Sequence, residues 1–252
     1  MENFGPVICM YLFPFGYSQS LYFNKMCGRY SQVYTVAQVA QQLEIPLEDS
    51  PEIVPNYNVA PTQEALVIIN EGPLRLEALR WGLVPYWSKD IQQGARLINA
   101  RRESIVTKPS FRIPIRQRRC LVIGDSFYEW RRSGPQKYPY RILRSNDELL
   151  VMAGIWDIAQ INGQEYRTFS IITTAPNKEM EGIHNRMPVL LISKEEQQSW
   201  LNNQDLEETM ALMKTPADDV LKYYRVSQRV NNVRSNGPEL HQLVNDDPLT
   251  LF

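Results

Sequence analysis

Only a few side chains in this sequence could carry acid–base or nucleophilic chemistry. The 252 residues include two histidines and three cysteines. His184 lies in the stretch GIHNRMP (182–188), which is polar, rich in turn residues and placed after an expected strand, where functional sites tend to be built. His184 is therefore a candidate acid–base group, although an isolated histidine is more often a structural hydrogen-bonding residue. His241 lies among surface-type residues, and we expect it to be inert.

Glu129 is a second candidate, because it is flanked by Phe127, Tyr128 and Trp130. A carboxylate among aromatic side chains is a candidate for a raised pKa and for acid–base work. The period-2 alternation of a strand would equally allow Glu129 to face outward between inward-facing aromatics. Both interpretations stay open at this point.

Several polar and aromatic residues have the chemistry of a nucleic-acid site. Asn99 and Arg101 supply an amide and a guanidinium, which suit sugar hydroxyls and phosphate. Trp81, Tyr86 and Trp87 offer aromatic faces on which unpaired bases could stack, although tryptophan is more often found in cores or interfaces. Each of these signals is weak when taken alone.

The charge is unevenly distributed along the chain. Residues 96–144 hold 13 of the 27 Lys and Arg and only three acids, so this segment is +10 and the rest of the chain is −11, for a net charge of −1. A basic face on a nearly neutral protein is expected of a surface that meets a phosphate backbone. The alternative is a solvated surface with acidic partners folded against it.

The cysteines and the hydropathy exclude several protein classes. Cys9, Cys27 and Cys120 are odd in number and show no CxxC spacing, so neither a disulfide framework nor a zinc site is predicted. A reducing, cytoplasmic compartment fits this usage best. Cys120 lies in an apolar stretch and is expected to be a buried thiol. No apolar run approaches the roughly 18 to 20 residues needed to span a membrane.

The expected elements are many short strands and a few helices, without βαβ alternation. A helix is predicted over residues 35–43 with Thr35 as its N-cap, and two more over 194–202, after Ser193, and 204–213. The segments 64–70 and 75–81 are expected to pair as a hairpin. Further strands are expected at 119–124, 140–143, 149–156 and 166–173. This order predicts one α+β domain with a mainly antiparallel sheet or barrel-like core and flanking helices.

The first 25 residues differ in composition from the rest. They are rich in aromatic residues, contain Pro14 within the apolar part, and begin with Glu2 rather than a basic residue, which argues against a signal peptide. We expect translation to start at Met26, or residues 1–26 to be an extension that is absent from the mature protein. A structured β-hairpin arm is the alternative. The expected organisation is thus an extension (1–26), a catalytic domain (27–244) and a C-terminal tail (245–252).

Short ungapped motifs follow one another along nearly the whole domain: MCGRY (26–30), YNVAPT (57–62), RWGLVP (80–85), NAR (99–101), FYEW (127–130), HNRMP (184–188) and VSQRVN (226–231) with Arg234. Together they resemble the SOS-response-associated peptidase (SRAP) family of abasic-site-processing proteins. Ser126 stands where the family commonly has Gly, and Asn185 where it commonly has Asp. Neither falls on a position expected to be catalytic, and the stretch before Met26 is the main departure.

The resemblance implies covalent chemistry at Cys27. An abasic deoxyribose opens to an aldehyde at C1′, and an N-terminal cysteine offers an amine that condenses to an imine and a thiol that closes a five-membered thiazolidine. The second step is intramolecular and benefits from a high effective molarity. An internal Cys27 has only an amide nitrogen, so the chemistry requires the loss of residues 1–26 by an alternative start, by cleavage in trans or by self-processing.

The resemblance also implies roles for other residues. Glu129 would orient or deprotonate the α-amine, His184 would act in opening the sugar ring and in reversing the cross-link, and Asn99 would hydrogen-bond the deoxyribose or its phosphate. The implied DNA-binding residues are Arg29, Pro61, Trp81, Arg101 and Arg186, with the three arginines on phosphates. No metal or organic cofactor is implied.

The implied protein is a cytoplasmic monomer, nucleoid-associated if bacterial, that senses abasic sites in single-stranded DNA and shields them by covalent cross-linking. Peptidase or hydrolase activity and lyase-like Schiff-base chemistry are implied with it. Two alternatives remain: a cysteine-dependent peptidase or amidohydrolase that uses Cys27 and His184 on exogenous peptides, and a non-enzymatic single-strand binder.

Overall fold

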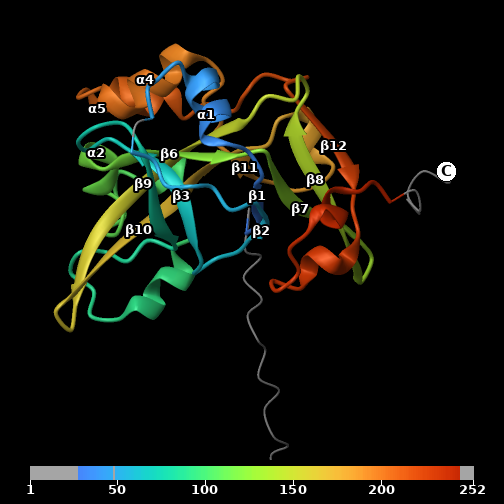
Figure 1. Cartoon of the computed structure of the whole chain (residues 1–252), viewed down its shortest axis with the longest axis horizontal. Helices are drawn as coiled ribbons and strands as arrows, with labels where there is room; N and C mark the ends of the chain where they lie inside the picture. Colours follow the sequence, from blue (N-terminus) through green and yellow to red (C-terminus); the bar gives the residue numbers. More distant parts are fainter. Residues whose placement is uncertain (1–27, 48, 245–252) are drawn as a thin grey trace, which may run out of the picture.

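Two β-sheets pack around a common hydrophobic core in the computed structural model, which describes residues 28–47 and 49–244 (Figure 1). The strands are β1 (Tyr30–Gln32), β2 (Asn56–Val59), β3 (Glu64–Ile69), β4 (Leu76–Trp81), β5 (Asn99–Arg101), β6 (Arg119–Gly124), β7 (Ser126–Ser133), β8 (Gln136–Arg144), β9 (Leu150–Ile161), β10 (Gln164–Thr174), β11 (Met187–Pro188) and β12 (Leu221–Arg225). The helices are α1 (Val36–Leu43), α2 (Pro114–Gln117), α3 (Lys178–Glu181), α4 (Lys194–Asn202) and α5 (Leu206–Leu212), and the 3-10 segments are η1 (Ile91–Arg96), η2 (Arg102–Ser104), η3 (Gln228–Asn231) and η4 (Pro238–His241).

The larger sheet closes into a barrel. Its strands follow the order β11-β10-β4-β3-β6-β9, and β9 also pairs with β10, so five strands form a ring. All of these pairings are antiparallel except β4 with β10, and β5 also pairs parallel to β10, farther along that strand than β4. The smaller sheet has the order β12-β8-β7-β1-β2. The predicted α+β fold with a mainly antiparallel, barrel-like core is confirmed.

Alternation along the barrel strands divides the core into two layers. Cys120 and Val122 of β6 point into the cluster shared with the smaller sheet, and Leu121 and Ile123 point into a second cluster under α1, α2 and α4. β6 is buried along its whole length because both of its faces are covered. The buried Cys120 thiol, whose pKa is raised by burial, confirms the prediction for that residue.

α1 and α4 begin where the sequence predicts, whereas α5 begins two residues later than predicted, after its cap Asp205. Thr35 and Ser193 each accept a hydrogen bond from the backbone N–H three residues on and receive the reciprocal bond, so both form capping boxes. α1, α4 and α5 lie together across the top of the barrel, and the red segments η3 and η4 lie against the smaller sheet at the lower right (Figure 1). No helix among residues 28–47 and 49–244 is long and apolar enough to cross a membrane.

Candidate functional site

Glu129 lies on the inner face of the smaller sheet. Phe127 and Glu129 alternate with Tyr128 and Trp130 along β7, and Phe127 belongs to the core shared with the barrel, whereas Tyr128 packs under η3 and η4 on the other face. The in-register partner of Glu129 on β8 is the buried Tyr140. Glu129 is only 2% exposed. The alternative that the sequence left open, an outward-facing carboxylate, is therefore wrong.

The pairing of β1 with β7 brings the start of the first motif to Glu129. Tyr30 is opposite Phe127, Ser31 is opposite Ser126, and Tyr128 N donates to Arg29 O at 2.9 Å. Continuing this antiparallel register places Gly28 opposite Glu129. Cys27, which precedes Gly28 in the sequence, lies outside the described residues.

Trp81, at the end of β4, binds the backbone of the residue that precedes Asn99. The indole N–H of Trp81 donates to Ile98 O at 2.9 Å, and the same carbonyl accepts from Ile171 N of β10, which fixes the backbone immediately before Asn99. The chain between Trp81 and Asn99 folds back on itself at Gly82, where φ is +119° and a Cβ would lie 2.5 Å from Gly94 O. Only glycine fits this close approach.

The turn that contains Pro61 packs beside the same end of β4. Thr62 N donates to Trp81 O, and Trp81 N donates to Gln63 O, both at 2.8 Å. Pro61 is partly exposed, but Trp81 is fully buried between Tyr30 and Phe169. A direct contact between Trp81 and a base finds no support in this geometry, because the ring lies on the inward face of β4. The sequence could not show this, because it does not say which face of β4 the smaller sheet covers.

His184 lies in the connection from α3 to β11, and its ring is hydrogen-bonded to the backbone of that connection. Its Nδ1 accepts a hydrogen bond from Arg186 N at 3.2 Å, so in the neutral ring the proton is on Nε2. Burial is the main cause that lowers the pKa of His184 from its ordinary 6.5, and the charges of Arg132 and Arg186 act in the same direction. This direction of shift favours the neutral form of His184 at pH 7.

The guanidinium groups of Arg186 and Arg101 differ in whether other residues of the protein bind them. The guanidinium of Arg186 binds both carboxylate oxygens of Glu103 and donates to Thr173 O at 2.6 Å. Arg101 is exposed at the end of β5, and its side chain makes no hydrogen bond or ion pair with another described residue. Phosphate contacts by these two arginines stay predictions, and Arg101 has the more accessible side chain.

Arg29 ties the start of β1 to the C-terminal segment. Its Nη1 donates to Asn58 Oδ1 and to Val230 O, both at 2.7 Å, and its guanidinium lies 6.0 Å from the Trp130 ring centroid. Asn58 in turn donates to Asn232 O and Ser235 O. Arg29 is buried, so its contacts are those of an anchor for β1, and its predicted phosphate contact is untested. Asn58 was not predicted as a site residue, although it lies in the second motif.

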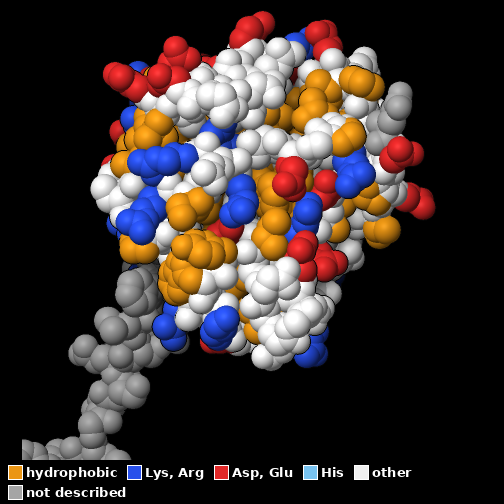
Figure 2. Space-filling view, turned by 90° about the vertical axis from the view of Figure 1, so that its left-hand side faces the viewer, with side chains coloured by type: hydrophobic (Ala, Val, Ile, Leu, Met, Phe, Trp, Pro, Cys, Tyr) orange, Lys and Arg blue, Asp and Glu red, His pale blue; other side chains and the backbone are white. Residues whose placement is uncertain are grey.

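The basic segment does not form one face. Arg119 is buried and donates to the carbonyls of Trp200, Asn203, Ile115 and Arg116. Three further arginines of the segment form ion pairs: Arg118 with Asp157, Arg141 with Asp125 and Arg144 with Glu148. On the face shown in Figure 2, Lys and Arg side chains are scattered among hydrophobic ones, and acidic side chains crowd the top. The predicted +10 segment therefore overstates the charge offered to a phosphate backbone.

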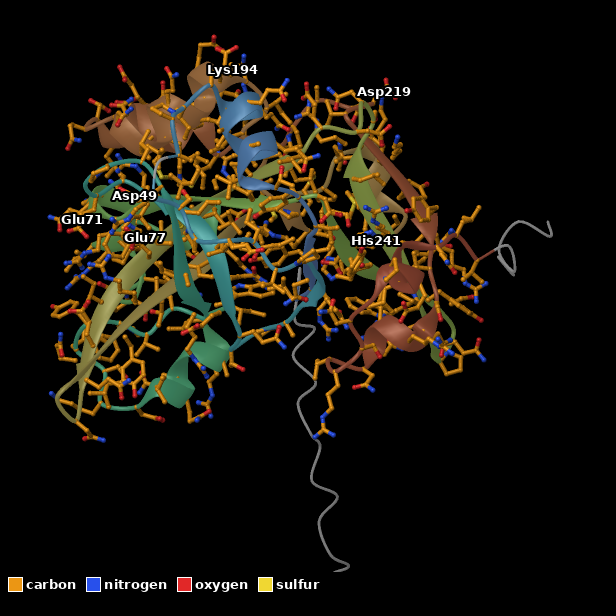
Figure 3. All side chains as sticks on the ribbon, in the orientation of Figure 1. Asp49, Glu71, Glu77, Lys194, Asp219 and His241 are labelled. Atoms are coloured by element: carbon orange, nitrogen blue, oxygen red, sulfur yellow. The ribbon has the colours of Figure 1, made fainter. Side chains whose placement is uncertain are left out.

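His241 is not the surface residue that the sequence suggests. Its side chain is 16% exposed, its Nε2 is 3.7 Å from Asp125 Oδ2, and its ring packs edge-on against Tyr57 and beside Tyr128. Arg141 donates to the same carboxylate of Asp125. Figure 3 shows His241 beside β7 and β8, away from the barrel. The cluster that contains it joins four separate segments of the chain, which contribute Tyr57, Asp125 with Tyr128, Arg141, and His241 itself.

Acidification is expected to destabilise the parent protein more than a His241→Phe variant. The pKa of His241 is lowered from 6.5 to about 4, mainly by burial and then by Arg141, with Asp125 opposing. The unfolded chain therefore binds a proton between pH 6.5 and 4 that the folded chain does not. The free energy of unfolding is thus undiminished by this group above pH 6.5 and decreases as the pH falls toward 4. The shift corresponds to roughly 3 kcal/mol. Urea unfolding at about pH 7.5, 5.5 and 4.5 measures it. Parallel pH profiles for the two proteins would contradict the prediction.

The site as described offers carboxylate, imidazole and amide groups but no metal-binding cluster. Within residues 28–47 and 49–244, no three or more His, Cys, Asp or Glu side chains are grouped so that they could hold a metal ion. The pairing of β1 with β7 brings Gly28 to Glu129, and the contacts of Trp81 and Arg186 join Asn99 and His184 to neighbouring strands. Carboxylate, imidazole and amide side chains of this kind can transfer protons and make hydrogen bonds to a bound molecule.

Comparison with known proteins supports the assignment of these motifs. Residues 26–233 match the family described as SOS response associated peptidase (SRAP). The chain is 42% identical to the abasic site processing protein YoqW of Bacillus subtilis over 223 residues, which cover 85% of this chain and 98% of YoqW. It is 31% identical to YedK of Escherichia coli, covering 87% of this chain and all of that protein, and 31% identical to mouse HMCES, covering 85% and 75%. A crystal structure of a Bacteroides thetaiotaomicron protein superposes with a TM-score of 0.75 at 28% identity, covering 86% of this chain and all of that one.

Proposed function

Because the chain belongs to the SOS response associated peptidase family, we propose that it processes abasic sites in single-stranded DNA through Cys27, acting as the first residue of a processed chain. The α-amine would attack the C1′ aldehyde of the open deoxyribose, and water would leave as the imine forms. The thiol would then add to the imine carbon while a proton moves to the nitrogen. The product is a thiazolidine that joins protein and DNA and shields the lesion.

The observation that carries this proposal is the register between β1 and β7. Continued by two residues, this register brings Gly28, which follows Cys27 in the sequence, opposite a carboxylate that is 2% exposed. A buried carboxylate beside an α-amine is suited to take a proton from the ammonium form. In this scheme Glu129 is that base.

The remaining site residues have complementary roles in the proposal. The neutral His184, with its proton on Nε2, would donate to the ring oxygen as the sugar opens and take the proton back when the cross-link reverses. Asn99, held in place through Ile98 O, would hydrogen-bond the deoxyribose or its phosphate. Both roles use protons and hydrogen bonds that these side chains can supply.

The direct test uses single-stranded DNA with one abasic site, made from uracil by a glycosylase, and protein whose first residue is verified as Cys27. Formation of a heat-stable adduct supports the proposal. The same oligonucleotide with its aldehyde blocked by methoxyamine should give none. Absence of an adduct with a verified free Cys27 amine would overturn it.

A peptidase function is the second candidate, and the family's description favours it. Cleavage of the bond before Cys27 would generate the amine that the first proposal needs, so self-processing and cross-linking are compatible. A peptidase acting on other chains makes a different prediction, namely turnover of an exogenous peptide without DNA. Lack of such turnover, together with cross-linking, would leave self-processing as the only peptidase step.

Replacing Arg101 by alanine is expected to weaken binding to single-stranded DNA and to flatten its salt dependence. Each phosphate contact contributes about 0.7 to the slope of log K against log salt for a single strand, so the slope should fall by about that amount. Arg75→Ala is the matched control: Arg75 immediately precedes the far end of β4 and is paired with Glu77. Fluorescence anisotropy over a salt series gives both slopes. A slope for Arg101→Ala equal to the parent's would show that Arg101 does not meet phosphate.

A further inference from the structure

We propose that Glu103 is a positioning residue for His184 and acts through Arg186. Glu103 would hold the Arg186 side chain, and the Arg186 backbone would hold the His184 ring. The importance of His184 for the reaction rests on the proposed function, whereas the arrangement of its ring can be tested separately.

The contact between Glu103 and Arg186 has the geometry of a strong ion pair. Nη1 and Nη2 of Arg186 lie 2.6 and 2.9 Å from Oε1 and Oε2 of Glu103. Such bidentate pairing matches the planar guanidinium to the carboxylate and fixes its orientation. The Arg186 side chain is 14% exposed and that of Glu103 is 53% exposed, so the carboxylate covers the arginine from the solvent side. Hydrogen bonding by Arg186 is the main cause that lowers the pKa of Glu103.

This ion pair connects the two segments that carry Asn99 and His184. Thr173 of β10 is paired with Arg101 of β5 on one side and with Pro188 of β11 on the other. Glu103 follows β5 by two residues, and Arg186 immediately precedes β11. Arg186 also donates to Thr173 O, so its guanidinium spans the end of β10. The three contacts together fix where Arg186 leaves the connection from α3.

The backbone of Arg186 can hydrogen-bond to the His184 ring in both protonation states of the ring. Arg186 N donates to Nδ1 at 3.2 Å, and Arg186 O lies 3.3 Å from the same nitrogen. The neutral ring accepts from the N–H, whereas the protonated ring can donate to the carbonyl. A residue that gains and loses a proton in each cycle can therefore keep one orientation, provided that Arg186 does not move.

The competing interpretation is that the main role of Arg186 is to bind a phosphate of the DNA. Both of its terminal nitrogens already bind Glu103, and one of them also binds Thr173. If phosphate binding were its main role, removal of Glu103 would free the guanidinium and raise the affinity for undamaged single-stranded DNA. The arrangement of the His184 ring would not change.

The first readout is the tautomer of His184 in protein labelled with ¹⁵N-histidine. The chain has only two histidines, so the spectrum is simple, and a His241→Gln variant assigns it. In the parent we expect His184 Nδ1 to be unprotonated. In Glu103→Ala both ring nitrogens should show averaged, tautomer-mixed shifts, with an intermediate change in Glu103→Gln. His241 should not change. Glu148→Gln, which removes a similarly exposed carboxylate from its pair with Arg144, is the matched control and should leave both histidines as in the parent.

The second readout separates rate from affinity. Glu103→Ala should slow cross-linking by about tenfold, less than the roughly 10²–10⁴-fold that a whole acid–base group contributes, and change the Kd for undamaged DNA by less than about threefold. An unchanged His184 tautomer in both Glu103 variants would overturn the proposal, as would tighter DNA binding with an unchanged rate. If the parent forms no cross-link at all, the proposed function fails, and the tautomer measurement still decides the role of Glu103.

Discussion

Protein that begins at Cys27 is expected to form a heat-stable adduct with abasic single-stranded DNA, and the same protein with Met26 or a longer segment attached is expected to form none. An amide nitrogen has no lone pair that can condense with an aldehyde, so the difference is all or none. With the amine free, ring closure by the thiol of the same residue gains from effective molarities on the order of 10⁵–10⁸ M. Intact mass spectrometry before the reaction and a denaturing gel after it are the two measurements.

One variant and one chemical modification separate the contributions of the amine and the thiol to adduct formation. Cys27→Ser with a free amine should form only an imine, which is lost on heating but is trapped by borohydride. Acetylation of the Cys27 amine should abolish both products while leaving the thiol intact. A stable adduct from protein whose mass shows that Met26 is retained would refute the thiazolidine chemistry, and would point instead to a thiol acting alone.

Local patterns in the sequence predict much of the fold. Thr35 and Ser193 cap their helices because capping depends on residues three apart. The hairpin of β3 and β4 and the doubly buried β6 follow from short apolar runs between turn signals. The strand boundaries expected above do not take into account the turn dipeptide Asn162-Gly163. Asn162 and Gly163, with φ of 53° and 78°, form the tight turn between β9 and β10, so these strands are longer than expected.

The candidate site depends on contacts that local patterns do not contain. Whether Glu129 faces inward is decided by the barrel that packs on β7, and no period-2 pattern within β7 can show it. Arg29 binds a carbonyl 201 residues away. Segment charge also misleads, because Arg119 points into the protein and binds carbonyl groups. The order of the motifs identifies which residues belong to the site, but the closure of the two sheets determines how they are placed.

Glu129→Gln is expected to slow cross-linking by about 10²-fold or more at pH 7 while leaving the affinity for undamaged single-stranded DNA within about twofold. Glutamine keeps the size of the side chain and its capacity to accept a hydrogen bond, but it cannot take a proton. The change therefore removes the proposed base with little change to packing. Single-turnover rates with protein in excess over labelled abasic DNA measure the effect without interference from product release.

The pH dependence of this defect distinguishes a base from a purely structural residue. An α-amine has an ordinary pKa of about 8, so at pH 7 most of it is protonated and must lose a proton before it can attack. If Glu129 takes that proton, the rate of the Gln variant should approach the parent's as the pH rises above about 8.5, because the amine is then already neutral. Glu196→Gln, which changes a partly buried carboxylate in the capping box of α4, is the control and should match the parent throughout. A defect of the same size at every pH would mean that Glu129 positions the amine rather than deprotonating it, and an unchanged rate at pH 7 would remove it from the mechanism.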